Sequence, residues 1–278
     1  MQRRSTVPEA PGPSPIAVVV AGATGWVGSA LVPAILAASD LALVGAVARR
    51  HAGQDVGTVL GGLPVGVTVV GTVPEALAAR AAVMVDFTSA VSVQGHVRAA
   101  LDRGVHVVVG SSGLDPADDP RLDAYARERG LGVVVAGNFS LVATLAKRLA
   151  LIAAAEMPGW EVVDYAAASK PDAPSGTAFE WAAALGAAHS KGPAGPGSEG
   201  IGHSQARGAT IAGVQVHSVR VPGYVLSTAL LAGAGDERLT IRYDAGQSPA
   251  PYLTGTLLAI RRVTSLLGLV RGLEQLLP

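Results

Sequence analysis

The chain has 278 residues, of which 49% are hydrophobic and only 15% are charged, with 21 basic and 21 acidic side chains. Disordered chains combine low hydrophobicity with high net charge, so this composition indicates a folded protein. A net charge of zero gives no basic field for binding nucleic acid or a membrane surface, and we expect neither partner. The absence of cysteine excludes disulfides, thiolate nucleophiles and zinc–thiolate sites.

The first uncharged run, Ile16–Ser39, follows two arginines and so imitates an export signal or a membrane anchor. Three glycines, Gly22, Gly25 and Gly28, interrupt it, and four prolines precede it. This pattern favours a buried strand, a glycine turn and a helix. We expect residues 1–15 to form a flexible tail on a cytoplasmic protein.

Short apolar runs alternate with helical stretches as far as residue 136. The expected strands are Ile16–Val20, Leu41–Val47, Val65–Val70, Ala82–Val85, His106–Val109 and Leu131–Ala136. The expected helices are Trp26–Ala38, Val73–Arg80, Ser92–Asp102 and Asp119–Arg129. Such alternation predicts an α/β fold with a Rossmann-like, doubly wound parallel sheet.

The order of the predicted elements changes after Asn138, where strands follow one another instead of alternating with helices. The expected strands are Trp160–Ala166, Val214–Val219, Tyr224–Leu231 and Arg238–Tyr243. The expected helices are Leu141–Met157, Ser175–Ala188 and Pro251–Leu267. A loop rich in glycine, serine and proline, His189–Gly208, joins two of these elements. This half predicts a second α+β domain built on a mixed sheet.

The segment Gly22–Gly28 lies between the first strand and the first helix, with the spacing G-x-x-G-x-x-G. Glycines there allow a dinucleotide pyrophosphate to approach the helix N-terminus, although a tight turn alone would also use them. The candidate cofactor residues in this loop are Gly22, Ala23, Thr24, Gly25, Trp26 and Val27.

The second strand ends in Arg49 and Arg50, where an NAD-binding fold usually places an acidic residue. Arginine suits a 2′-phosphate through charge-assisted hydrogen bonds, so we expect NADPH as cofactor, with NADH possible. A solvated basic loop is the alternative. Phe87 and the triplet Gly110, Ser111 and Ser112 follow the carboxyl ends of later strands, where such sheets bind ligands.

The segment Ser169–Ala178 suggests a receptor for a small carboxylate. Ser175 is a plausible N-cap, which would leave the amides of Gly176 and Thr177 pointing into the space before the helix, with Lys170 adding a charge. An ordinary capped helix with a surface lysine would look the same.

Other polar residues give weaker signals. His217 and Arg220 share one predicted strand and are further candidates for the cleft. Lys147 and Arg148 are interpreted as a solvated helix face, and the six histidines show no metal-ligand spacing, so we expect no metal.

The string Lys170-Pro-Asp-Ala-Pro-Ser-Gly-Thr-Ala178 resembles the signature of the 4-hydroxy-tetrahydrodipicolinate (dihydrodipicolinate) reductase family, a pyridine-nucleotide family of lysine and diaminopimelate biosynthesis. The resemblance runs from Ile16 to the C-terminus, and the C-terminal part looks most like the actinobacterial branch. It also includes Val85–Thr88, Gly110–Gly113 and Ala136–Ser140.

The resemblance implies a dinucleotide domain of residues 16–139 plus 250–278, a substrate and oligomerisation domain of residues 140–249, and a homotetramer. By match, Ala136, Asn138 and Phe139 would join the cofactor site. Lys170 would be the acid/base residue, and Gly176 and Thr177 would hold a substrate carboxylate.

This sequence departs from the family pattern where two adjacent histidines, one of them the proton donor, should precede the lysine. Ala166 and Ala167 stand there. The smaller departures are Trp26 in place of a basic residue, Gly137 in place of proline, and Leu226-Ser227-Thr228 in place of a polar motif. Losing a positioned general acid costs about 10²–10⁴-fold in rate.

Three functions therefore stay open. The first is a lysine-pathway reductase whose proton comes from Lys170, Tyr165 or water. The second is a paralogue that reduces another substrate, such as a cyclic imine with fewer carboxylates. The third is a non-catalytic NADPH-binding protein. The second is favoured, because an iminium needs no acid at the carbon that receives hydride.

Overall fold

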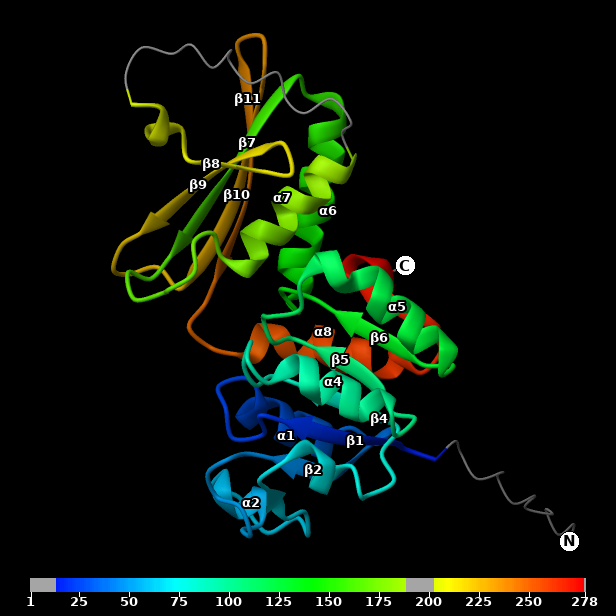
Figure 1. Cartoon of the computed structure of the whole chain (residues 1–278). Coiled ribbons are helices and arrows are strands. Elements are labelled where there is room, and N and C mark those ends of the chain that lie inside the picture. Colours follow the sequence, from blue (N-terminus) through cyan, green and yellow to red (C-terminus); the bar gives the residue numbers. More distant parts are fainter. Residues whose placement is uncertain (1–13, 189–202, 278) are drawn as a thin grey trace, which may run out of the picture.

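The computed structural model describes residues 14–188 and 203–277. The predicted tail, apart from residues 14 and 15, and most of the predicted loop His189–Gly208 lie outside these residues. The described chain forms two sheets, stacked one above the other in Figure 1. The predicted fold class, a doubly wound parallel sheet with a second mixed sheet, is confirmed.

The first sheet has seven parallel strands in the order β12-β6-β5-β4-β1-β2-β3. Its strands are β1 (Ile16–Ala21), β2 (Leu41–Val47), β3 (Val69–Val70), β4 (Val83–Asp86), β5 (His106–Val109), β6 (Gly132–Val135) and β12 (Gly268–Arg271). Nearly every residue of the central strands is buried, which explains their continuous runs of valine. The predicted strand Val65–Val70 pairs only over its last two residues.

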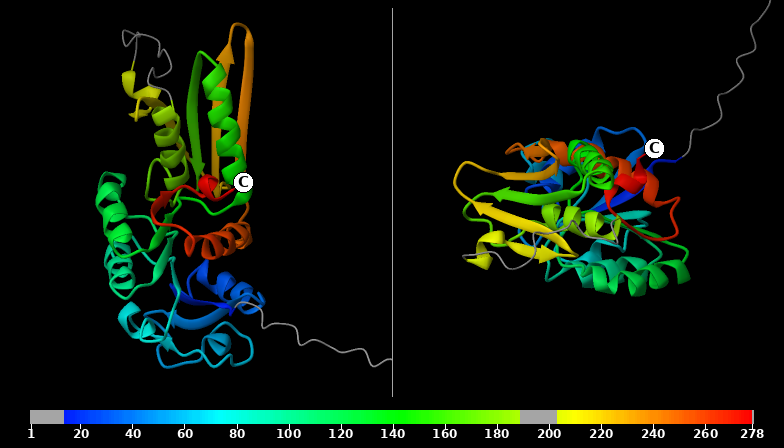
Figure 2. Two further views of the ribbon diagram at one scale, coloured as in Figure 1. Left: turned by 90° about the vertical axis from the view of Figure 1, so that its right-hand side faces the viewer. Right: turned by 90° about the horizontal axis from the view of Figure 1, so that it is seen from above.

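Helices cover both faces of this sheet (Figure 2). One face packs against α1 (Gly28–Leu36) and α8 (Ala250–Val263). The other packs against α3 (Val73–Ala76), α4 (Val93–Leu101) and α5 (Asp119–Glu128). A short helix, α2 (Val56–Val59), lies in the β2–β3 connection, where no helix is predicted from the sequence.

The second sheet has five strands in the order β11-β10-β7-β9-β8, of which β7 and β9 are parallel. Its strands are β7 (Gly159–Ala166), β8 (Ala209–Ile211), β9 (Val214–Arg220), β10 (Leu226–Ala234) and β11 (Glu237–Ala245). Two helices, α6 (Leu141–Glu156) and α7 (Gly176–Ala188), pack on one face. No helix of the described residues covers the other face (Figure 2).

The chain crosses between the two parts twice, from β6 to α6 and from β11 to α8. After the second crossing it adds β12 beside β6 and ends in a short 3₁₀ helix, η3 (Leu273–Leu276). The sequence predicts α8 but not β12, which has only four residues. No helix within residues 14–188 and 203–277 is long and apolar enough to cross a membrane.

Candidate active site

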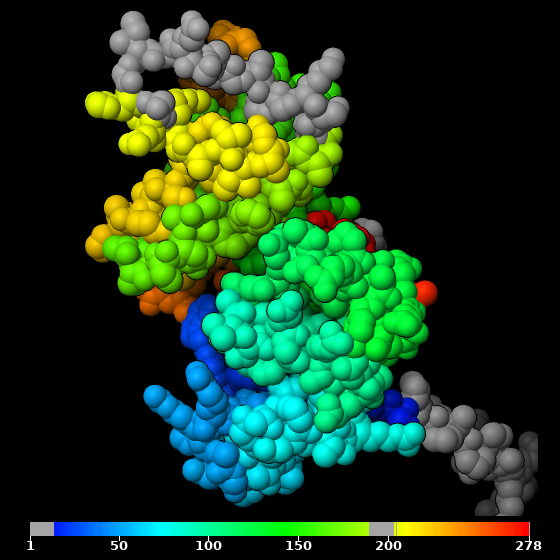
Figure 3. All heavy atoms as spheres, viewed as in Figure 1, coloured from blue at the N-terminus to red at the C-terminus, as the bar shows by residue number. Residues whose placement is uncertain are grey.

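A cavity of about 550 Å³ lies between the part built on the seven-stranded sheet and the part built on the five-stranded sheet. The space-filling view shows that the surface is recessed between these two parts (Figure 3). Residues of both parts line it, because it faces the carboxyl ends of β4, β5 and β6 on one side and the start of α7 on the other. The predicted site residues that line it are Trp26, Val27, Phe87, Gly110, Ser111, Ser112, Ala136, Asn138, Phe139, Lys170, Ser175, Gly176 and Thr177.

The glycine loop from β1 to α1 is anchored to the neighbouring strand, because Gly22 and Ala23 both donate their amides to the carbonyl of Val47. Gly22 has a φ of +86°, and a Cβ there would meet the carbonyl of Phe87 at 2.4 Å. The amides of Thr24, Trp26 and Val27 donate no hydrogen bond within the described residues. Free amides at a helix N-terminus suit a pyrophosphate, so the loop fits the predicted cofactor.

Arg49 and Arg50 follow β2 two residues beyond the carbonyl that holds the glycine loop, and both are exposed. Neither has an ion-pair partner within the described chain. The nearest carboxylate in the sequence, Asp55, accepts hydrogen bonds from the amides of Thr58, Val65 and Gly66. Burial opposes its charge, but these amides outweigh burial and hold the pKa of Asp55 below its usual value. The carboxylate oxygens of Asp55 are thus occupied by amides of its own loop.

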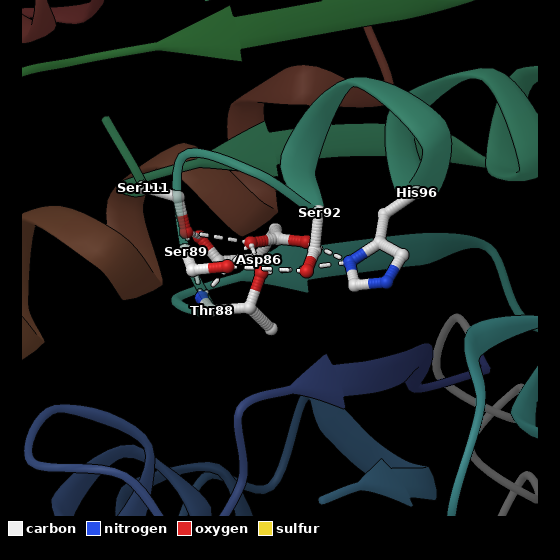
Figure 4. A network of polar contacts seen from close by, with 6 residues as sticks. All are labelled: Asp86, Thr88, Ser89, Ser92, His96 and Ser111. Atoms are coloured by element: carbon white, nitrogen blue, oxygen red, sulfur yellow. Dashed lines mark hydrogen bonds and ion pairs between the residues drawn. The ribbon is translucent and has the colours of Figure 1, made fainter. Parts of the chain in front are cut away.

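A buried carboxylate, Asp86, ties together the two loops that form the floor of the cavity (Figure 4). One oxygen accepts the hydroxyls of Thr88 and Ser111 at 2.7 and 2.6 Å, and the other lies 2.8 Å from Nδ1 of His96 on α4. The amide of Thr88 in turn donates to Ser111 Oγ at 2.6 Å. The hydroxyl of Ser111, predicted to contact cofactor, is therefore occupied within the protein.

A second buried carboxylate, Asp164 on β7, holds the start of α7. Its oxygens accept the amide of Ser175 at 2.9 Å, the hydroxyl of Ser175 at 2.6 Å and Arg220 Nη2 at 2.7 Å, with Ser218 Oγ at 3.2 Å. Ser175 also caps the helix as predicted, because its Oγ accepts the amide of Ala178. The amides of Gly176 and Thr177 donate to no group within the described residues.

Lys170 lies at the edge of the cavity with about a third of its side chain exposed, and its Nζ is 2.8 Å from Asp172 Oδ1. Arg271, the other cation in the lining, is paired in the same way with Asp119. The cavity is thus lined by one partly exposed ammonium and by two amides that make no hydrogen bond within the described residues. This arrangement suits one carboxylate better than two.

The structure does not bring every predicted residue to the cavity. Tyr165 lies on the uncovered face of the second sheet, where its ring stacks on Tyr224. The two strand residues His217 and Arg220 lie on opposite faces: His217 bonds Glu161, while Arg220 bonds Asp164. Neither of them lines the cavity.

One contact in the lining and one buried charge outside it were not predicted. Trp26, 52% exposed, meets the ring of Tyr252 edge-on at 5.6 Å. Burial, with the nearby Tyr243, raises the pKa of Tyr252 to about 12. Lys147, interpreted from sequence as part of a solvated face, is instead buried between Glu180 and Glu274.

A parallel Rossmann-type sheet, a second mixed sheet and a ligand-sized cavity between them define the class of two-domain pyridine-nucleotide oxidoreductases. Models of the N- and C-terminal parts of dihydrodipicolinate reductase match residues 16–139 and 135–277. The chain belongs to this reductase family.

Relatives support this assignment over nearly the whole chain. The 4-hydroxy-tetrahydrodipicolinate reductase of Moorella thermoacetica is 41% identical over 94% of this chain and 98% of its own, and that of Thermosynechococcus vestitus is 37% identical over 95% and 98%. Among solved structures, dipicolinate-bound dihydrodipicolinate reductase from Paenisporosarcina sp. TG-14 superposes with a TM-score of 0.74 at 28% identity, over 95% of this chain and 100% of that one.

Proposed function

We propose that this protein is an NADPH-preferring reductase that transfers hydride to the C=N or conjugated C=C bond of a small, cyclic carboxylate. One observation carries the proposal: a single cavity joins the glycine loop and the Phe87 and Gly110–Ser112 loops to Lys170 and the start of α7. When bound, the dinucleotide supplies the hydride from its nicotinamide ring.

The cofactor preference rests on the end of β2. Arg49 and Arg50 are exposed and unpaired within the described chain, and the oxygens of Asp55 are occupied, so this carboxylate is not free to bind the ribose hydroxyls of NADH. The domain that holds the cofactor is, in this proposal, residues 16–139 together with residues 250–278. The substrate domain is residues 140–249.

Within the family, we favour a paralogue that reduces a cyclic imine. Ala166 is buried and Ala167 offers no proton, so the two positions expected to supply an acid and a second carboxylate contact are empty of both. An iminium already carries its proton on nitrogen, and hydride addition at carbon completes the reaction without an acid. Lys170 and the amides of Gly176 and Thr177 would orient the substrate carboxylate.

The second candidate is 4-hydroxy-tetrahydrodipicolinate reduction itself, which the names and 35–41% identities of the relatives favour. In this case water or Lys170 would deliver the proton, since Tyr165 lies on the far face of the sheet.

The test is oxidation of NADPH, followed by absorbance, with 4-hydroxy-tetrahydrodipicolinate and with a panel of cyclic imino acids. Turnover of imino acids only would support the paralogue, and efficient turnover of 4-hydroxy-tetrahydrodipicolinate would refute it. If NADPH still binds but no substrate causes its oxidation, both proposed reactions are refuted and the protein is a non-catalytic NADPH-binding protein. Lys170→Ala should abolish the activity found, whereas the exposed Arg121→Ala should not.

We also propose a homo-oligomer, a tetramer by family resemblance. On the uncovered face of the five-stranded sheet, Leu231 is exposed opposite Glu161 and Tyr165 stacks on Tyr224, and a second copy would bury these groups. Sedimentation equilibrium tests this, and a monomer at micromolar concentration would contradict it.

A further inference from the structure

A buried ionic cluster lies beside the cavity at the first crossing between the two parts. Lys147 of α6 has only 5% of its side chain exposed, and its Nζ lies 2.6 Å from Glu180 Oε1 and 2.7 Å from Glu274 Oε1. The second oxygen of Glu180 accepts the amide of Gly137 at 2.7 Å. The cluster therefore joins α6, α7, the C-terminal η3 and the β6–α6 crossing.

The same crossing carries a second link to α7. Asn138 donates its side-chain amide to Thr177 Oγ1 at 3.2 Å, and its Oδ1 accepts the amide of Ser140. A Cβ built on Gly137 would lie 2.7 Å from Glu180 Oε2 and 3.2 Å from the carbonyl of Gly176. The start of α7 is thus packed directly against the crossing, with no room for a side chain between them.

The third link reaches the parallel sheet. Glu274 lies two residues after Gly272. The amide of Gly272 donates a hydrogen bond to the carbonyl of Val135 at the end of β6. Lys147 therefore connects a helix of the substrate half to the last segment of the cofactor half. Removing Lys147 would leave both carboxylates without their cation, whereas removing either glutamate would leave Lys147 paired with the other.

We propose that Glu180 is a positioning residue for the cavity. Its carboxylate, held by Lys147, fixes the crossing at Gly137 against α7 and so sets where the amides of Gly176 and Thr177 stand relative to the cofactor loops. A glycine at position 137 is part of this device, because its amide is the donor and its missing side chain makes room for the carboxylate. Proline, expected there from the family pattern, has no such donor.

The cluster is tested without any substrate by hydrogen–deuterium exchange of the whole protein, read in peptides that cover residues 136–140 and 176–180. Glu180→Ala should speed exchange in both peptides about tenfold or more, as expected for loss of a hydrogen bond to a charged group. Glu180→Gln keeps an acceptor for the Gly137 amide and should fall between. The exposed Glu128→Gln should change neither peptide. Unchanged exchange in Glu180→Ala would overturn the proposal.

The expected effect on the reaction rests on the proposed function. It is measured by comparing KM and kcat for the substrate with the Kd for NADPH. Glu180→Ala should raise KM for the carboxylate substrate about tenfold while the Kd for NADPH changes less than about twofold, and Glu180→Gln should restore most of the loss. Gly137→Pro should raise KM similarly, and adding it to Glu180→Ala should add little. A fall in kcat with unchanged KM would show a merely structural role and overturn the proposal. Absence of turnover in the wild type would refute the proposed function, while exchange would still decide on Glu180.

Discussion

Asp164→Asn should strongly destabilise the protein, because the native carboxylate is wholly buried and paired with Arg220. Breaking a buried ion pair by removing one partner costs about 3–5 kcal/mol, since the remaining charge stays unpaired. The asparagine oxygen still accepts the amide of Ser175, so we expect the lower end, about 3 kcal/mol. Urea unfolding followed by circular dichroism measures this difference.

Asp244→Asn is the matched control. It also removes a carboxylate paired with an arginine on the same sheet, Arg242, but this carboxylate is 57% exposed. Exposed pairs contribute about 0–1 kcal/mol, so the control should lose little. Equal losses for the two variants, or a loss below about 1 kcal/mol for Asp164→Asn, would refute the view that burial of the Asp164–Arg220 pair stabilises the start of α7.

Three further outcomes follow from the site. Arg49→Glu should weaken NADPH about tenfold or more while sparing NADH, as measured by fluorescence titration; an equal change for both would contradict the 2′-phosphate assignment. His96→Ala should cost about 1–3 kcal/mol in urea unfolding, because the buried Asp86 loses a partner. The raised pKa of Tyr252 means that its contribution to stability is complete below pH 10 and is lost as pH rises toward 12, and Tyr252→Phe should reduce the alkaline loss in unfolding curves measured across that range.

The sequence predicts the sheets well because buried parallel strands leave continuous apolar runs, such as Val83–Val85 and Val107–Val109. It predicts the residues of the cavity because a parallel sheet gathers its strand ends at one edge. It does not predict β12, which pairs across more than a hundred residues of chain and has no local signal of its own.

The burial of Lys147 shows a different limit. Leu145, Leu149 and Ile152 stay exposed on α6, while small residues such as Ala146 and Ala150 pack inward. Hydrophobicity therefore marks the wrong face of this helix. What places Lys147 inside is the approach of Glu180 and Glu274, which lie 33 and 127 residues further along the chain. No spacing within the helix carries that information.

The return of the chain to the parallel sheet has a consequence for synthesis. The apolar face that contains Val85, Val108 and Val134 is covered by α8, and the edge of β6 is closed only by β12, which ends at Arg271. A nascent chain cannot complete this half until residues 250–271 have left the ribosome, so a cut after residue 139 does not yield two independent halves. The strands up to β6 therefore depend on segments made more than a hundred residues later, and a fragment ending at residue 139 should aggregate instead of folding.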